Sequence, residues 1–197
     1  MKHHLYPLFA SNVSVFEIEA DYKKYISELE KESYEETNIH NSNNSSISSN
    51  NKILNENKFK DLKNKIIDCF ETYNEYMQYS CDVEMYNSWA TKTNLNQESE
   101  FHNHSNSLVS GVLYLQEGMS DICFENFNKP HFSVPLVKSN IYNSQSYYFT
   151  PKPGMLLLFP SMLYHKITKN NKGIRYSIAF NFIPKGKIGT IDNELIL

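Results

Sequence analysis

Two histidines two positions apart, His102 and His104, stand before an apolar run that predicts a strand, and His165 opens another such run later. Side chains at positions i and i+2 of an extended segment point to the same side, so the pair can converge on one ion. A third imidazole from a neighbouring strand would complete a facial ligand set with open coordination positions. Imidazole suits Fe, Zn, Cu and Ni alike, so these residues predict a metal site without selecting the metal. Surface or hydrogen-bonded core histidines are the alternative interpretation of a His-x-His pair.

A single arginine, Arg175, stands among 19 Lys and Arg residues, ten positions after His165. In the run that it opens, every second residue is bulky and apolar, namely Tyr176, Ile178, Phe180 and Phe182. The other face carries Arg175, Ser177, Ala179 and Asn181, which suits a pocket lining. A guanidinium can hold a carboxylate through two parallel hydrogen bonds and an ammonium cannot, so we expect a carboxylate ligand here. A salt bridge to a surface Glu is the alternative.

The elements that must position these residues divide the chain into two halves. Near-alternating apolar residues predict a short strand over 13–18, and Asp21 is a suitable N-cap for a helix over 22–35. Residues 37–51 are dominated by Asn and Ser, a composition that predicts a disordered insertion. Apolar residues at spacings of three and four then predict a helix from Phe59 to Met77.

After Cys81, short aromatic and β-branched runs separated by Gly, Pro and Asn predict a mainly β half. The expected strands cover 110–115, 122–127, 147–150, 155–159, 165–168 and 175–183. Short strands at this spacing favour an antiparallel sandwich or barrel, with the N-terminal helices packed on one face.

Composition limits the partners. The 197 residues fit one domain, and the net charge of −3 leaves no basic stripe for nucleic acid. We expect no membrane span, because no apolar run approaches the roughly 20 residues that a bilayer requires. The first residues lack an apolar signal core, and Cys69, Cys81 and Cys123 form no Cys-x-x-Cys pair. These features together predict a cytoplasmic protein.

Five segments in this order and spacing resemble the 2OG-Fe(II) oxygenases of bacteria and marine phages. They are 101–107 (FHNHSNS), 110–115 (SGVLYL), 153–161 (PGMLLLFPS), His165 and 175–181 (RYSIAFN). The resemblance extends to Ser88 and Trp89 and, more weakly, to Tyr6 and residues 7–9, and so covers most of the chain outside the Asn/Ser insertion.

The resemblance implies one oxygenase domain over 1–197 with a double-stranded β-helix, the jelly-roll or cupin-like core, and N-terminal helices as a buttress. It implies Fe(II) at His102, His104 and His165, with no catalytic residue beyond the metal centre. It further implies that Arg175, Ser177 and Tyr114 bind 2-oxoglutarate, and that an unidentified substrate is hydroxylated with release of succinate and carbon dioxide. His104 departs from the wider superfamily, which usually has Asp or Glu there. Two arrangements stay open: a site with three histidine ligands, or a site in which one of His102 and His104 binds the metal and the other lies just outside its ligand set.

Two rival functions stay open from the sequence. A cupin-type metalloenzyme could use three histidines without 2-oxoglutarate, although it would need no buried Arg. A catalytically inactive jelly-roll module could serve binding or structure. Tyr114 could instead be a packed strand aromatic, Trp89 a core anchor or, with Asn181, part of the substrate mouth. Molecular oxygen and the prime substrate are the further expected partners, and a homodimer is left open.

Overall fold

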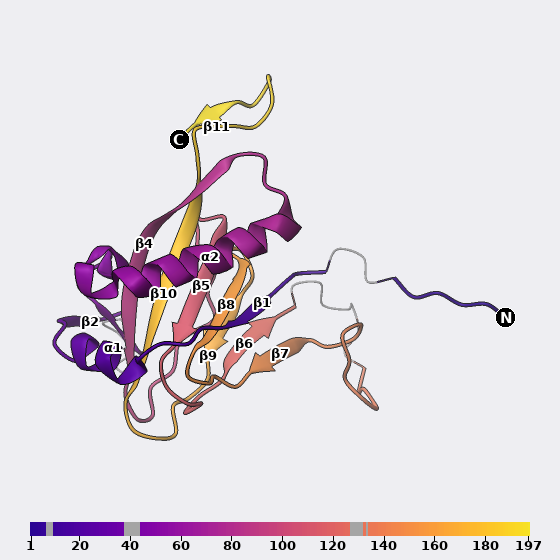
Figure 1. Ribbon diagram of the computed structural model, residues 1–197. Helices are drawn as coiled ribbons and strands as arrows, with labels where there is room; N and C mark the ends of the chain where they lie inside the picture. The colour runs from indigo at the N-terminus through magenta and orange to yellow at the C-terminus, as the bar shows by residue number, and fades with distance from the viewer. Residues whose placement is uncertain (7–9, 38–43, 127–131, 133) are drawn as a thin grey trace.

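The computed structural model describes residues 1–6, 10–37, 44–126, 132 and 134–197, and its centre is a seven-stranded antiparallel sheet. The strand order is β1-β8-β5-β10-β4-β3-β2. The strands are β1 (Ser14–Glu17), β2 (Tyr34–Glu36), β3 (Ser46–Ser48), β4 (Asp82–Thr93), β5 (Val109–Tyr114), β8 (Met155–Pro160) and β10 (Arg175–Lys185). Neighbours in space are mostly distant in sequence, as in a jelly roll (Figure 1).

A second, three-stranded sheet faces the first, in the order β7-β6-β9. Its strands are β6 (Ile122–Glu125), β7 (Ser146–Phe149) and β9 (His165–Ile167). Buried residues of both sheets form one apolar cluster, made of Val112, Tyr114, Ile122, Phe124, Met155, Leu157 and Phe159. The expected fold, mainly β with a double-stranded β-helix, is confirmed, and the expected strands are found within two residues at each end.

The helices cover the other face of the large sheet (Figure 1). Helix α1 (Tyr22–Leu29) begins after Asp21, whose side chain accepts a hydrogen bond from the Lys24 backbone N–H at 3.2 Å. It ends six residues before the expected end, because the chain turns there to enter β2. The one-turn helices η1 (Ile53–Asn55) and η2 (Asn57–Phe59) lead into α2 (Lys60–Met77), which buries Leu62, Ile66, Phe70 and Tyr73.

The sequence did not predict β4, although it is the partner of β10 along its whole length. The register sets Thr93 opposite Arg175, Thr91 opposite Ser177 and Trp89 opposite Ala179. The pairing shifts between Asn181 and Phe182, which is a β-bulge. The alternation expected for β10 is confirmed, since its bulky residues join the helix-side core while Arg175 and Ser177 point toward the small sheet's side.

The expectation of a disordered insertion over 37–51 is wrong for residues 44–51, and residues 38–43 lie outside the described part. Strand β3 pairs with both β2 and β4. Serines in and just before β3 make hydrogen bonds in place of apolar contacts. Ser45 Oγ, before the strand, lies 2.9 Å from Thr93 Oγ1, and Ser48 Oγ accepts from the Ala90 N–H at 3.0 Å. Polar side chains with such partners can be buried at little cost.

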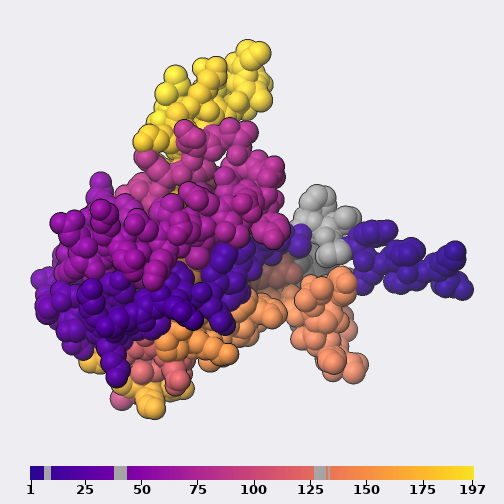
Figure 2. Space-filling model, viewed as in Figure 1, coloured from indigo at the N-terminus to yellow at the C-terminus, as the bar shows by residue number. Residues whose placement is uncertain are grey.

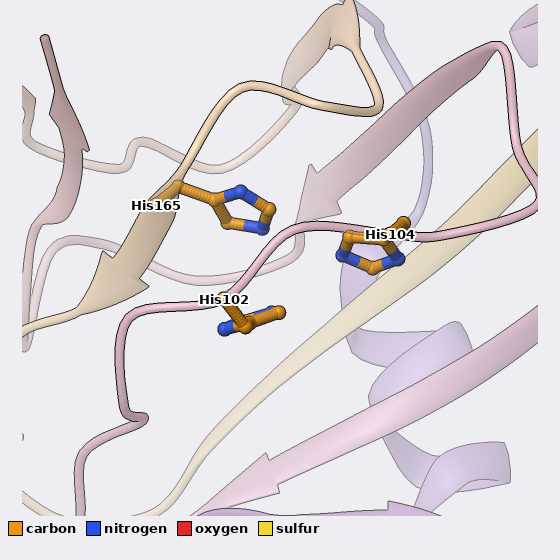
Figure 3. Close-up of side chains that lie close together, drawn as sticks. All are labelled: His102, His104 and His165. Carbon is orange, nitrogen blue, oxygen red and sulfur yellow. The ribbon is translucent and has the colours of Figure 1, made fainter. Parts of the chain in front are cut away.

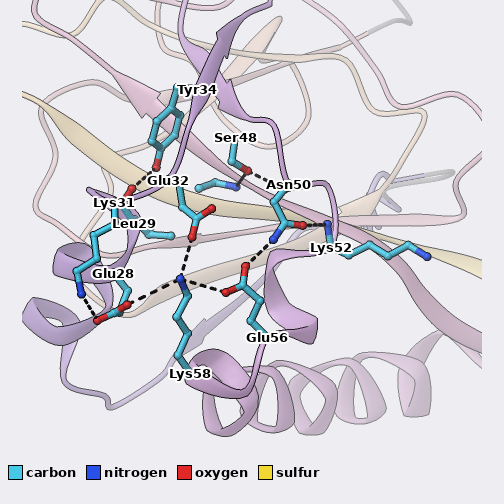
Figure 4. A network of polar contacts seen from close by, with 11 residues as sticks. Glu28, Leu29, Lys31, Glu32, Tyr34, Ser48, Asn50, Lys52, Glu56 and Lys58 are labelled. Atoms are coloured by element: carbon cyan, nitrogen blue, oxygen red, sulfur yellow. Dashed lines mark hydrogen bonds and ion pairs between the residues drawn. The ribbon is translucent and has the colours of Figure 1, made fainter.

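A charged cluster fixes the base of the β2–β3 hairpin (Figure 4). The Lys58 ammonium lies 2.8 Å from Glu32, 3.1 Å from Glu56 and 3.8 Å from Glu28. Asn50, just after β3, donates to Glu56 at 2.5 Å. The cluster therefore ties the chain after α1, the end of the hairpin and the start of η2 together.

Residues 1–6 and the hairpin of β11 (Lys187–Ile188) and β12 (Leu195–Ile196) extend from the body (Figures 1 and 2). The hairpin exposes Ile191, Leu195 and Ile196. Neither segment reaches the cavity described below. Within the described ranges, no helix combines the length and the apolar character that crossing a membrane requires.

Candidate metal centre

The three histidines of the sequence pattern lie together at the end of the groove between the two sheets. One ring nitrogen from each histidine lies within 4.8 Å of the corresponding nitrogen of the other two. His102 and His165 are directly opposite each other, joined by backbone hydrogen bonds of 3.0 and 2.9 Å. His104 is held by a backbone bond of 2.9 Å to the Ser161 carbonyl. Figure 3 shows the three imidazoles gathered where the segment before β5 passes β9.

Two of the rings have a defined hydrogen-bonding role at Nδ1. His102 Nδ1 lies 2.8 Å from the Glu100 carbonyl oxygen, and His165 Nδ1 lies 2.8 Å from that of Leu163. A carbonyl can only accept, so Nδ1 carries the proton in both rings. This tautomer leaves Nε2 as the nitrogen that can bind a metal.

Burial favours the neutral form of the two less accessible rings. Burial first, and the nearby His102 second, lower the pKa of His104 to about 4. The same two causes lower the pKa of His165 to about 3, and only 5% of that residue is exposed. Both rings are therefore neutral at pH 7 and available as ligands.

A cavity of about 410 Å³ lies against the cluster. All three histidines line it, and Tyr114 lies along the same wall as Trp89, the residue that the sequence left between core anchor and substrate mouth. Asn44 and Ser45 of the β2–β3 hairpin close another side. Asn181 is 3% exposed, does not line the cavity, and instead accepts a hydrogen bond from Ser110 Oγ at 2.6 Å.

Arg175 is fully buried beneath this cavity, with its guanidinium carbon 5.4 Å from the centre of the Tyr114 ring. Its NH1 donates to Ser120 Oγ at 2.7 Å and to the Ser120 carbonyl at 3.3 Å, while NH2 is 3.5 Å from Thr93 Oγ1. Within the described residues no carboxylate makes an ion pair with it. The surface salt bridge considered from the sequence is therefore excluded for the described residues.

Two polar atoms at this point have no hydrogen-bond partner among the described residues. Arg175 Nε and the Tyr114 hydroxyl are both buried without a hydrogen bond. Burial lowers the pKa of Arg175 and raises that of Tyr114, so each group loses solvation without a compensating bond. A buried, unpaired cation beside an unpaired hydroxyl is a suitable receptor for an anion with two acceptor oxygens.

The remaining predicted residue, Ser177, is 3% exposed and stands between Thr91 and Tyr114 in adjacent strands. Ser177 and Arg175 do not line the open cavity, whereas Tyr114 does. Sequence reasoning missed Ser120 and Thr93, which hold the guanidinium. Thr93 could have been found only from the β4–β10 register, and Ser120 follows a Gly-containing turn without any motif.

Residues 87–181 match the family model described as "Putative 2OG-Fe(II) oxygenase". A comparison with curated proteins found no match. Many solved structures share the fold. A Pseudomonas putida prolyl-4-hydroxylase has a TM-score of 0.64 and 14% identity, over 91% of this chain and 96% of that one. HygX from Streptomyces hygroscopicus, with nickel, 2-oxoglutarate and hygromycin B bound, has a TM-score of 0.63 and 13% identity, over 88% and 83%.

The epimerase SnoN from nogalamycin biosynthesis, described as non-heme and alpha-ketoglutarate dependent, has a TM-score of 0.68 and 9% identity, over 89% of this chain and 80% of that one. Identities this low establish the fold alone. The matched segment begins at Asn87 in β4 and ends at Asn181 in β10, so it contains the histidine cluster and Arg175. Over residues 87–181 the chain is therefore similar to the 2OG-Fe(II) oxygenase family, and the double-stranded β-helix around this segment is the fold of the solved structures named above.

Proposed function

We propose that the chain is an Fe(II)- and 2-oxoglutarate-dependent oxygenase whose iron is held by His102, His104 and His165. The proximity of one ring nitrogen from each histidine supports this ligand set, as do the lowered pKa values of His104 and His165. Since no ligand is a carboxylate, the set carries no charge. The ion keeps its full charge toward its remaining ligands, which favours an anionic co-substrate.

The assignment of 2-oxoglutarate as co-substrate rests on two buried atoms without a hydrogen bond, Arg175 Nε and the Tyr114 hydroxyl. We propose that the distal carboxylate of 2-oxoglutarate binds between Arg175 Nε and the Tyr114 hydroxyl, with the Ser177 hydroxyl beside them. Ser120 and Thr93 hold the guanidinium from its other side, so the charge is fixed in place before the ligand arrives. Arg175 is buried, so the carboxylate replaces solvation that the folded chain does not provide.

When bound, iron and 2-oxoglutarate supply the oxidising chemistry: oxygen and 2-oxoglutarate yield succinate and carbon dioxide, and one oxygen atom enters a C–H bond of the substrate. The chain's own residues bind and orient. The apolar cluster between the sheets excludes water from the inner end, and the β2–β3 hairpin forms the opposite wall of the cavity.

We propose further that residues 1–197 form one oxygenase domain in the cytoplasm. Both sheets contribute to the same cavity, which supports a single domain. Cys69, Cys81 and Cys123 are all free thiols, which supports a reducing compartment.

Incubation with Fe(II), 2-oxoglutarate and oxygen tests this function without a known substrate. We expect slow, iron-dependent formation of succinate, which a chelator stops and Arg175→Ala abolishes. A cupin-type enzyme or an inactive module predicts none. Iron binding without any 2-oxoglutarate turnover or binding would therefore favour those rivals.

A further inference from the structure

The three imidazoles are not oriented in the same way. His102 and His165 each have Nδ1 fixed by a backbone carbonyl at 2.8 Å. The His104 ring makes no hydrogen bond to any residue that the structure describes. Ligand histidines are normally held by such a bond, because it fixes both the tautomer and the plane of the ring. Something else must fix the plane of His104.

The His104 ring lies beside the rings of His165, at 5.2 Å and 7°, and of His102, at 5.3 Å and 45°, which are the other two proposed ligands. Among the described residues, the aromatic neighbour of His104 outside that ligand set is Trp89. Their ring centres are 5.7 Å apart and their planes differ by 24°, which is a stacked arrangement. Trp89 faces the cavity from β4, and its partner across the ladder is Ala179, a small residue that leaves room for an indole on the inner face. Offset stacking favours one ring plane over others without using a ring nitrogen.

We infer that Trp89 is a positioning residue for His104, taking by stacking the role that a hydrogen bond has for the other two histidines. This inference rests on the proposed ligand role of His104. Neither nitrogen of His104 has a hydrogen-bond partner in the described part of the chain, so the ring plane is fixed while the tautomer is free to suit the metal. Trp89 therefore acts on the metal through His104.

The chain offers a direct test, because Trp89 is its only tryptophan. A Ni(II) ion coordinated by an imidazole in contact with the indole should quench its emission, whereas Zn(II), which has a filled d shell, should bind the same site with little quenching. We expect Ni(II) to quench wild-type emission in proportion to occupancy. Quenching should be lost in His104→Ala. Unchanged wild-type emission at full Ni(II) occupancy would overturn the inference.

A series at position 89 provides the second measurement, with Ni(II) affinity determined by calorimetry. Trp89→Leu keeps an apolar side chain but removes the ring, and we expect affinity to fall about tenfold or more. Trp89→Phe keeps a stacking ring and should stay within about threefold of wild type. Phe70 lies on α2, and its ring stacks on that of Phe182 with centres 4.0 Å apart. Phe70→Leu is therefore the control for a general loss of stability, and it should bind Ni(II) normally.

The results separate the two levels of the proposal. If His102→Ala and His165→Ala also bound Ni(II) like wild type, the proposed metal site itself would be wrong. If those variants lost affinity while Trp89→Leu and Trp89→Phe bound equally well, the metal site would stand and the role of Trp89 would be refuted.

Discussion

Replacement of Arg175 by methionine should separate stability from co-substrate binding. The fully buried guanidinium makes hydrogen bonds to Ser120 at 2.7 and 3.3 Å and to Thr93 at 3.5 Å. Losing these bonds should cost roughly 3 kcal/mol in total at about 1 kcal/mol each. Removing an unpaired buried cation recovers a desolvation cost of several kcal/mol. The two effects oppose each other, so we expect the free energy of unfolding of the ligand-free protein to change by less than about 2 kcal/mol.

Binding should respond very differently. At 2-oxoglutarate concentrations of about 100 times Kd, wild type should gain about 2.7 kcal/mol from the ligand. For a chain of this length, that gain corresponds to a rise in Tm of roughly 5–10 °C. Arg175→Met should show no such rise at the same concentration.

The assay is thermal unfolding of Ni(II)-loaded protein with and without 2-oxoglutarate, since Ni(II) does not support turnover. The control is Lys185→Met, which removes an exposed ion pair with Glu84 and should keep the full ligand effect. A large loss of stability in Arg175→Met, combined with a normal rise in Tm on adding 2-oxoglutarate, would show that Arg175 is a structural cation and refute the reasoning.

Three further predictions concern stability. Deleting residues 44–51 with a short Gly/Ser bridge should lower Tm by more than about 5 °C, because β4 loses its β3 partner and Thr93 its hydroxyl contact; an unchanged Tm in a thermal melt would contradict this. Lys58→Met should cost about 1–2 kcal/mol in urea unfolding, more than an isolated surface pair, since three carboxylates lose their shared cation; no loss would mean that the cluster is not stabilising. The metal-free protein should lose stability as pH falls from about 6.5 toward 4, because unfolded histidines bind protons in this range and folded His104 and His165 do not. In urea titrations, His165→Phe should reduce the slope of unfolding free energy against pH by about 1.4 kcal/mol per pH unit. An identical slope in wild type and variant would refute this prediction.

The parts of the fold that the sequence predicted are those with a strong local pattern. Helix α2 has a regular apolar face, and β10 alternates between large apolar and small polar residues, so both were found with nearly correct ends. Strand β4 was missed because its residues mix polar and aromatic types, and because the bulge opposite Asn181 breaks its period of two. Strand β3 was missed because hydrogen bonds of serine hydroxyls in and beside it, and not apolar contacts, hold it against β4.

The candidate site was predicted in its residues but not in its geometry. The spacing of His102 and His104 and the single Arg175 are visible in the sequence. The contacts of Arg175 with Ser120 and Thr93 and the stacking of Trp89 on His104 join segments far apart in the chain. Such contacts follow from strand register, which no local pattern in this sequence specifies.

The most direct test of the account is titration of the anaerobic Fe(II) protein with 2-oxoglutarate, following the metal-to-ligand charge-transfer absorption. The account predicts a band that saturates at one 2-oxoglutarate per chain and is absent in His165→Ala. In Arg175→Lys the charge is kept but the Nε–H donor beside the Tyr114 hydroxyl is lost, so the affinity should fall about 30- to 150-fold, equivalent to about 2–3 kcal/mol. No band in wild type, or wild-type affinity in Arg175→Lys, would contradict the assignment of the histidine cluster and Arg175 to iron and 2-oxoglutarate.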